Sequence, residues 1–224
     1  MSRQAPDLGR FDADPDRSFN MPAAYYTDPE IFEREKEAIF FKSWRFVGHV
    51  TEMPETGDYL TQDICCENVF VVRDGAGDIN GFYNVCQHRA HELVRGRRGN
   101  VKAVITCPYH AWAYGLDGAL RTARFSEKVA GFDKSDFGLS PIRVEIFCGF
   151  VFVNLDAEAK TIRECAPGFE ETFRAQVPDL DRMVWVDQAN FDIAANWKVV
   201  AENGLDGYHV FLSGPAHKAL GELM

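Results

Sequence analysis

The sequence predicts an α+β fold in which an antiparallel β-sandwich domain is followed by the start of a second domain of helices and sheet. Two observations support this prediction. From Trp44 to Leu155, short β-branched and aromatic runs alternate with turn residues, as in a sandwich or small barrel. On both sides of this region the spacing of apolar residues becomes helical. We expect an N-terminal arm and helix at 1–43, the sandwich at 44–156, and the start of the second domain at 157–224.

The N-terminal part is expected to be an arm followed by one helix. Residues 1–24 contain four Asp and three Pro, which favours a segment ordered only where it docks. A helix is predicted from Pro29 to Ser43. Thr27 and Asp28 can cap this helix, and proline suits its first turn.

Seven short strands are predicted in the sandwich, separated by turns rich in Gly, Asp and Asn. The runs are Arg45–Val50, Asp58–Thr61, Asn68–Arg73, Ile79–Asn84, Val101–Thr106, Arg143–Glu145 and Phe150–Asn154. Beyond the sandwich, the pattern predicts a helix at Thr161–Phe173, a strand at Met183–Phe191 and a helix from Ala195 to about Ser213. Gly214-Pro215 would end the last helix, because proline disfavours helical backbone in the residue before it.

Composition excludes several classes of protein. The chain has 224 residues, 46% of them hydrophobic, which is typical of a globular protein and excludes a wholly disordered one. Its net charge of −10 argues against nucleic acid as a partner, because phosphate contacts require clustered Lys and Arg. No apolar run reaches the roughly 20 residues of a membrane span, and no signal peptide is visible. A cytoplasmic protein is therefore expected, in which the six cysteines favour metal binding over disulfides.

Two short Cys/His pairs each follow a predicted strand: Cys86-Gln87-His88 and Cys107-Pro108-Tyr109-His110. They could be ordinary loop residues, ligands of a structural zinc, or ligands of an iron–sulfur cluster. Zinc fingers commonly pair Cys with Cys and His with His. Here each loop supplies one of each, which suits two irons, one held by two thiolates and the other by two imidazoles. That is the ligand pattern of a Rieske [2Fe–2S] cluster.

From about Tyr25 to about Ala216, the chain resembles the large (α) subunit of Rieske-type non-haem iron aromatic-ring-hydroxylating oxygenases. The matching text is Cys86-Gln87-His88-Arg89, then Cys107-Pro108-Tyr109-His110-Ala111-Trp112 and Tyr114-Gly115-Leu116-Asp117-Gly118. Neither loop has the additional cysteine of respiratory-chain Rieske proteins, which favours the oxygenase or ferredoxin branch. Cys107–Gly118 and Leu120–Phe125 also resemble members that demethylate betaine-like quaternary amines.

A second group of candidate residues lies near the C-terminus. On a helix, Asn203, Asp206 and His209 recur at i, i+3 and i+6 and so share one face. Taken alone, this could be a helix surface with a satisfied histidine. Asn196-Trp197-Lys198 before it resembles the start of the family's mononuclear iron site. The resemblance implies that His209 is an iron ligand, that Asp206 is the catalytic bridge toward a neighbouring subunit's cluster, and that Asn203 supports the site from outside the ligand set.

The sequence departs from the family pattern in two ways. The second histidine ligand is expected five residues after the first, where this chain has Gly214. His217 is the candidate replacement. The family's carboxylate ligand lies far downstream, and this chain ends at Met224. We therefore expect a fragment, a truncated frame or a decayed copy that holds only part of the mononuclear Fe(II) site and is inactive on its own.

The resemblance implies an NAD(P)H-dependent oxidoreductase of aromatic compound catabolism, acting as a monooxygenase or a dioxygenase. Electrons would pass from a ferredoxin or flavin reductase through the [2Fe–2S] cluster to mononuclear iron, for O₂-dependent hydroxylation of a small aromatic substrate. The full-length family implies a homotrimer. One alternative is oxidative N-demethylation of a betaine-like quaternary amine. An alternative of another class is a Rieske electron-transfer module without oxygenase activity.

Overall fold

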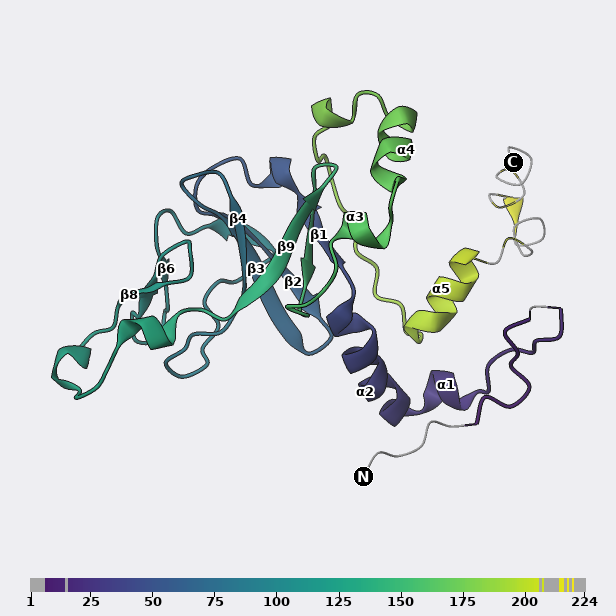
Figure 1. Cartoon of the computed structure of the whole chain (residues 1–224), viewed down its shortest axis with the longest axis horizontal. Helices are drawn as coiled ribbons and strands as arrows, with labels where there is room; N and C mark the ends of the chain where they lie inside the picture. The colour runs from purple at the N-terminus through teal and green to yellow at the C-terminus, as the bar shows by residue number, and fades with distance from the viewer. Residues whose placement is uncertain are drawn as a thin grey trace. The chain divides into compact units, whose positions relative to one another are not determined.

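The computed structural model describes residues 7–14, 16–205, 207, 214, 215, 217 and 219. The chain divides into two compact units, one of Met1–Glu35 with Gln188–Met224 and the other of Lys36–Asp187. No helix within the described residues is long and apolar enough to cross a membrane. Antiparallel sheets together with helices confirm the α+β prediction (Figure 1).

The larger unit is built on a seven-stranded antiparallel sheet with the order β1-β10-β9-β4-β3-β2-β5. Its strands are β1 Arg45–His49, β2 Asp58–Ile64, β3 Glu67–Arg73, β4 Ile79–Tyr83, β5 Arg98–Asn100, β9 Pro141–Phe147 and β10 Phe150–Asn154. Six of them are predicted from the sequence. β5 is not, because its Gly-Asn pair reads as a turn, and it is a strand only through pairing with β2.

A second sheet has three short strands in the order β6-β7-β8. They are β6 Ile105–Thr106, β7 Ala113–Tyr114 and β8 Leu120–Thr122. Only the end of the predicted run Val101–Thr106 is a strand here. Short 3₁₀ turns complete the unit: η1 Phe40–Lys42, η2 Val50–Glu52, η3 Ser126–Lys128, η4 Lys134–Phe137 and η5 Leu180–Arg182.

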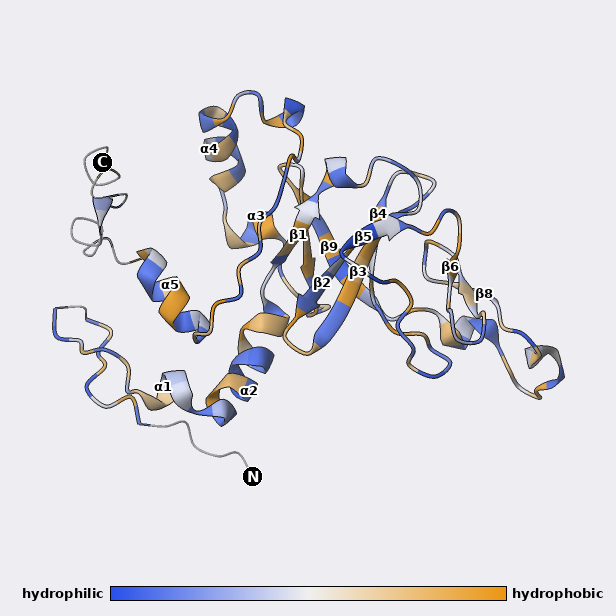
Figure 2. Ribbon diagram, turned by 180° about the vertical axis from the view of Figure 1, so that it is seen from behind, coloured by the Kyte–Doolittle hydropathy of each residue, from blue (hydrophilic) through white to orange (hydrophobic). Residues whose placement is uncertain are grey.

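Strand β3 is buried on both faces, and its alternate residues belong to different apolar clusters. Val69 and Val71 pack with residues of β1 and β10. Phe70 and Val72 pack in the cluster that also contains Cys86 and Cys107. Figure 2 shows the hydrophobic stretches on these central strands. The candidate ligand loops are therefore anchored to the core of the large sheet.

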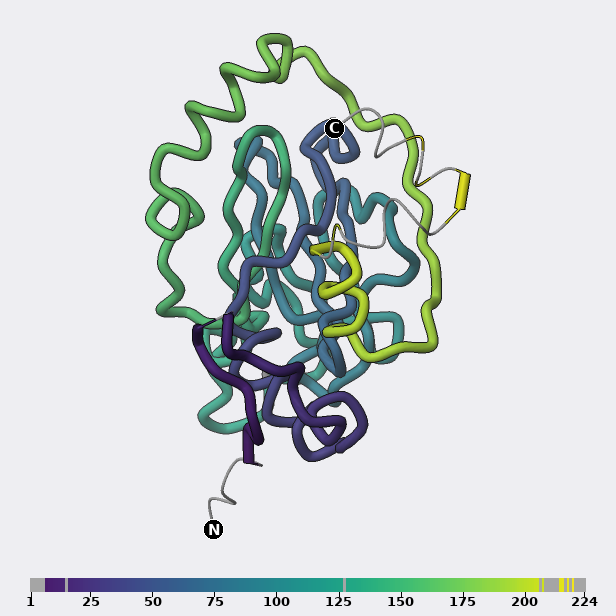
Figure 3. Tube along the Cα trace, turned by 90° about the vertical axis from the view of Figure 1, so that its right-hand side faces the viewer, coloured from purple at the N-terminus to yellow at the C-terminus, as the bar shows by residue number. Residues whose placement is uncertain are grey.

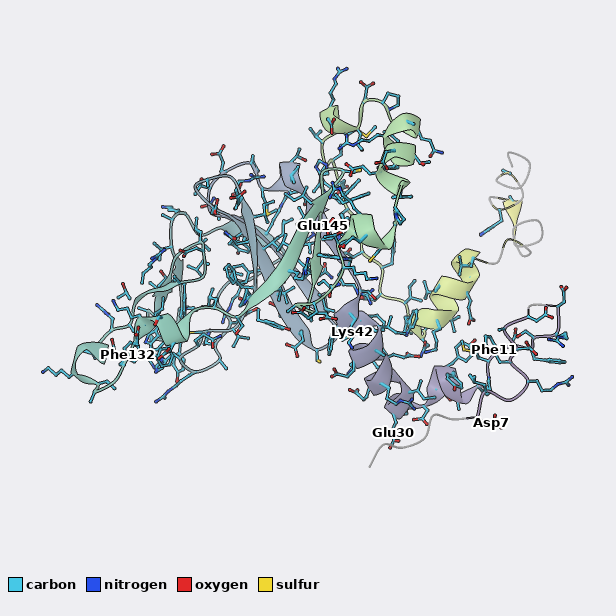
Figure 4. The ribbon with its side chains drawn as sticks, in the orientation of Figure 1. Asp7, Phe11, Glu30, Lys42, Phe132 and Glu145 are labelled. Carbon is cyan, nitrogen blue, oxygen red and sulfur yellow. The ribbon has the colours of Figure 1, made fainter. Side chains whose placement is uncertain are left out.

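The helices are shorter than predicted. α1 is Ala24–Thr27, and α2 is Pro29–Ala38, after which the chain tightens into η1 instead of continuing to Ser43. The Asp28 carboxylate accepts a hydrogen bond from the Glu30 amide, as expected of a cap. The predicted helix Thr161–Phe173 is broken at Gly168, which has a φ of 79°, into α3 Ile162–Cys165 and α4 Phe169–Gln176. Glu145 of β9, labelled in Figure 4, accepts hydrogen bonds from the start of α3.

The predicted strand Met183–Phe191 is wrong. This segment has no regular structure (Figure 3), and Val186 is 89% exposed. Its β-branched composition suits a strand, but the described residues offer it no pairing partner. α5 spans Trp197–Leu205, within the helix predicted from Ala195 to Ser213. Residues 206 and 208–213 lie outside the described part of the chain.

Candidate metal centre

Two loops carry the four candidate cluster ligands, and their backbones follow the same plan. In the first loop the Ala90 amide donates to the Cys86 carbonyl at 2.9 Å, and the Cys86 amide donates to the His91 carbonyl at 2.9 Å. In the second loop the equivalent bonds join Ala111 to Cys107 at 3.0 Å and Cys107 to Trp112 at 2.8 Å. The fifth residue of each loop is an alanine with positive φ, 52° and 56°. Each turn therefore closes on its own cysteine.

The two cysteines are buried, with exposed fractions of 1% for Cys86 and 2% for Cys107. Burial raises the pKa of the Cys86 thiol, Tyr114 and the His88 backbone act in the opposite direction, and Cys107 raises it further. The Tyr114 hydroxyl lies 3.2 Å from the Cys86 sulfur and accepts a hydrogen bond from the Gln87 amide at 3.1 Å. A metal that binds these sulfurs as thiolates would have to overcome the penalty of burying their charge.

The two candidate histidines lie together on the surface side of the cysteines. The ring centroids of His88 and His110 are 4.7 Å apart, with His110 exposed and His88 half-buried. His88 stacks on the buried ring of Trp112, with centroids 4.8 Å apart and planes 11° apart. Burial, followed by the nearby His110 and Arg89, lowers the pKa of His88. The neutral imidazole that results is the form that binds metal.

The donors thus form a sulfur pair and a nitrogen pair. Within the described residues, no group of three or more His, Cys, Asp or Glu side chains is placed to hold one metal ion. A tetrahedral zinc site needs four donors around one point, whereas a [2Fe–2S] cluster takes two on each of two irons. A sulfur pair behind a nitrogen pair matches the two donor sets that a [2Fe–2S] cluster takes.

Two residues that support the ligand loops, Asn84 and Tyr114, are given no role by the sequence prediction. Asn84 is buried two residues before Cys86 and accepts hydrogen bonds from the amides of Leu93 and Val94, both at 3.0 Å. Its amide group donates to the Val94 carbonyl and to the Asn68 side chain, both at 2.7 Å. The signal for Asn84 was a polar side chain at the end of an apolar strand, next to a candidate ligand.

A cavity of about 530 Å³ lies beside the histidine pair. It is bordered by Tyr109 and by the loop that follows β8, which includes Phe132, labelled in Figure 4. Phe125, in the same loop, has a φ of 63° and is 86% exposed. The imidazoles therefore face an open, partly apolar surface.

The predicted mononuclear iron residues are only partly described. Asn203 lies exposed on α5, while Asp206 and His209 lie outside the described residues. Gly214 has a φ of 115°, and His217 is half-buried. The second iron site therefore stays a prediction.

Comparison with known families identifies the first site's domain. The Rieske [2Fe-2S] domain family matches residues 43–133, which include both loops. Those residues are thus a Rieske [2Fe–2S] domain.

Relatives of known function extend the match along the chain. The carnitine monooxygenase oxygenase subunit of Escherichia coli (strain K12) is 41% identical over 97% of this chain and 58% of its own length. The anthranilate 1,2-dioxygenase large subunit of Acinetobacter baylyi is 40% identical over 83% of this chain and 40% of its own length. The glycine betaine monooxygenase oxygenase subunit of Pseudomonas aeruginosa is 36% identical over 89% of this chain and 46% of its own length.

Solved structures agree. The quaternary ammonium Rieske monooxygenase CntA, in complex with L-carnitine, matches with a TM-score of 0.86 and 39% identity over 96% of this chain and 60% of that chain. Naphthalene 1,2-dioxygenase from Rhodococcus sp. matches with a TM-score of 0.76 and 32% identity, over 91% of this chain and 47% of that chain. Along most of its length the chain is therefore similar to the large subunits of Rieske non-haem iron oxygenases. The Rieske domain implies a [2Fe–2S] cluster, and the similarity to these subunits implies mononuclear iron. The chain spans less than two thirds of these relatives' lengths.

Proposed function

We propose that this chain is the part of a Rieske oxygenase subunit that receives electrons from a ferredoxin or flavin reductase, for O₂-dependent oxidation of a quaternary amine. The observation that carries the proposal is the pair of loops with one backbone plan, which set a buried cysteine pair behind a surface histidine pair. Carnitine and glycine betaine monooxygenase subunits among the relatives support the quaternary-amine class.

In this proposal Cys86 and Cys107 hold one iron of the cluster, and His88 and His110 hold the other. When bound, the cluster supplies one-electron transfer. The protein's part is positional: burial keeps water from the sulfurs, and the Trp112 ring fixes the plane of His88. The exposed His110 presents its ring where an electron donor or acceptor can approach.

The same proposal assigns mononuclear iron to His209, with His217 as candidate second ligand and Asn203 in support. Asp206 would link this site to a neighbouring subunit's cluster, so the subunit would act in a homotrimer. A carboxylate at this position could hydrogen-bond a ligand histidine and so couple the two metal sites.

Two other functions have specific support. The anthranilate 1,2-dioxygenase large subunit is 40% identical to this chain, which favours an aromatic substrate. A Rieske electron-transfer module is favoured by Gly214, because glycine offers no side-chain ligand where the family places its second histidine.

The test begins with the protein as the cell makes it, purified and analysed for iron and acid-labile sulfide. A red-brown protein with the reduced-state EPR signal of a Rieske cluster is expected, and a colourless zinc-loaded protein would refute the cluster. O₂ uptake is then measured with a competent reductase and L-carnitine, γ-butyrobetaine, glycine betaine or anthranilate. Uptake stimulated only by the quaternary amines supports the proposal. Uptake only with anthranilate identifies the aromatic class, and cluster reduction without any uptake identifies the electron-transfer module.

A further inference from the structure

The tripeptide Asn196-Trp197-Lys198, at the start of α5, is bonded through all three side chains to the N-terminal helical segment. The Asn196 side-chain amide donates to the Tyr26 carbonyl at 3.1 Å. The Trp197 indole donates to the Glu35 carboxylate at 2.8 Å. The Lys198 ammonium lies 2.6 and 2.8 Å from the two Glu35 oxygens. In the sequence the same tripeptide carries the resemblance to the family's mononuclear iron site.

The ion pair between Glu35 and Lys198 is buried, with side-chain exposed fractions of 11% and 7%. The Glu35 carboxylate accepts three hydrogen bonds, and the Lys198 ammonium also lies 5.2 Å from the centre of the Trp197 ring. A buried charge pair is tolerated only with good geometry and further hydrogen bonds, and removing one partner leaves the other charge uncompensated. The pair therefore favours one arrangement of α5 on the N-terminal segment.

One turn further along α5, a second contact repeats the attachment. The Tyr26 hydroxyl donates to the Glu202 carboxylate at 2.7 Å. Glu202 lies four residues after Lys198 and so shares its face of the helix. The hydrogen bond to Glu202, together with burial and its charge, raises the pKa of Tyr26, which keeps the phenol a donor. Asn196 in turn caps α5 by accepting from the Lys198 amide at 3.1 Å.

We infer that Glu35 and Tyr26 are positioning residues for α5, the helix that leads into the predicted iron ligand His209. The inference rests on the proposed function for the role of that ligand. In this proposal neither residue binds the iron. Each acts through the first two turns of α5 and sets the point from which the chain runs to the iron site. A preformed helix start reduces the chain ordering that metal binding would otherwise require.

The first test is hydrogen exchange on the cluster-loaded protein. Glu35→Gln keeps the shape of the side chain but leaves the Lys198 charge buried without its counter-ion. We expect α5 amides to exchange at least about tenfold faster, with β3 and β10 unchanged. Asp192→Asn, which removes an exposed carboxylate in the same unit, is the matched control and should resemble the parent. Unchanged α5 exchange in Glu35→Gln would overturn the inference.

A milder variant covers the case in which Glu35→Gln does not fold. Tyr26→Phe removes one hydroxyl and should speed α5 exchange several-fold, and parent-like exchange would count against the inference. Lys198→Met added to Glu35→Gln removes both buried charges and should bring the exchange rate back toward the parent value.

The second test measures iron retained beyond the two irons of the cluster, by equilibrium dialysis against Fe(II). Affinity for this third iron should fall about tenfold in Glu35→Gln and stay at the parent value in Asp192→Asn. Faster α5 exchange with undiminished iron affinity would reduce Glu35 to a purely structural residue and overturn its positioning role. A parent that retains no third iron would refute the mononuclear-iron part of the proposed function, and α5 exchange would still decide whether Glu35 and Tyr26 hold the helix.

Discussion

The Tyr114 hydroxyl lies 3.2 Å from the Cys86 sulfur, and neither side chain is exposed by more than 1%. The same hydroxyl accepts from the Gln87 amide, and between Tyr114 and Cys86 either the hydroxyl or the thiol can be the donor until a metal takes the thiol proton. Burial of Tyr114 and its hydrogen bond to Cys86 raise the pKa of its phenol, which keeps the phenol proton in place. In the cluster-loaded protein Tyr114 would therefore donate to a thiolate ligand.

Tyr114→Phe should lower the reduction potential of the cluster. A donor at the sulfur stabilises the more negative, reduced state, so its loss favours the oxidised state by on the order of tens of millivolts. The potential is measured by titration followed in the visible spectrum. Tyr83→Phe is the control, since the Tyr83 ring packs against the other apolar cluster, which contains Val69 and Val71. An unchanged potential in Tyr114→Phe would show that the hydroxyl does not tune the cluster.

Cys107→Ser should abolish the cluster, because one thiolate cannot hold the sulfur-ligated iron. Acid-labile sulfide should fall to background in this variant. Cys148→Ser is matched to it, since Cys148 is also a buried thiol but packs with Phe147 and Leu180, in a different apolar cluster. Loss of sulfide in both variants would mean that Cys107 acts through packing and not as a ligand.

Asn84→Ala should destabilise the protein by about 2–4 kcal/mol, because it leaves buried backbone groups of Leu93 and Val94 without partners. The variant should also lose its cluster faster, since Asn84 holds the loop after His91. Urea unfolding and the decay of visible absorbance report the two effects. Asn190→Ala, at an exposed asparagine, should stay within about 0.5 kcal/mol of the parent. Equal stability of the two variants would contradict the assignment.

His49 should make the protein less stable in mild acid. Burial is the main cause that lowers the pKa of His49, and Glu52 opposes it in part. The unfolded chain then binds the proton more tightly than the folded one. The stability that His49 contributes is therefore complete above about pH 6.5 and declines as the pH falls toward the folded-state pKa.

The measurement is the urea midpoint between pH 7 and pH 5. The parent midpoint should fall over this range, and His49→Gln should fall less. His91→Gln, which changes a partly exposed histidine, should keep the parent's dependence. A His49→Gln variant with the parent's full acid sensitivity would assign that sensitivity to other groups.

Much of the sandwich can be predicted from the sequence because its long strands carry β-branched runs between clear turns. β5, β7 and β8 cannot, since they have only two or three residues each and become strands through their neighbours. The strand predicted at Met183–Phe191 is wrong for the opposite reason. The composition of this segment favours a strand, but a strand also needs a neighbour to pair with, and composition does not reveal whether one is present.

The candidate ligands could be predicted because metal coordination constrains residue type and spacing along a short loop. Tyr114 and Asn84 could not be assigned their roles. Tyr114 lies on β7 of the three-stranded sheet, 28 residues along the chain from Cys86. Glu35 lies 163 residues from Lys198, and no local pattern links them. Contacts of this kind exist only once the chain has folded.

The self-closing hydrogen bonds of the two ligand loops bear on how the cluster is inserted. Each loop is held by hydrogen bonds within itself and by its place in the apolar interior, so we expect it to keep its shape before the metal binds. The cluster would then be inserted into a site that is already formed. Little conformational entropy of the chain would be lost when it binds. In the apoprotein the two loops would already have nearly the conformation that binds the cluster. Small zinc domains differ, because they fold only when their ion binds.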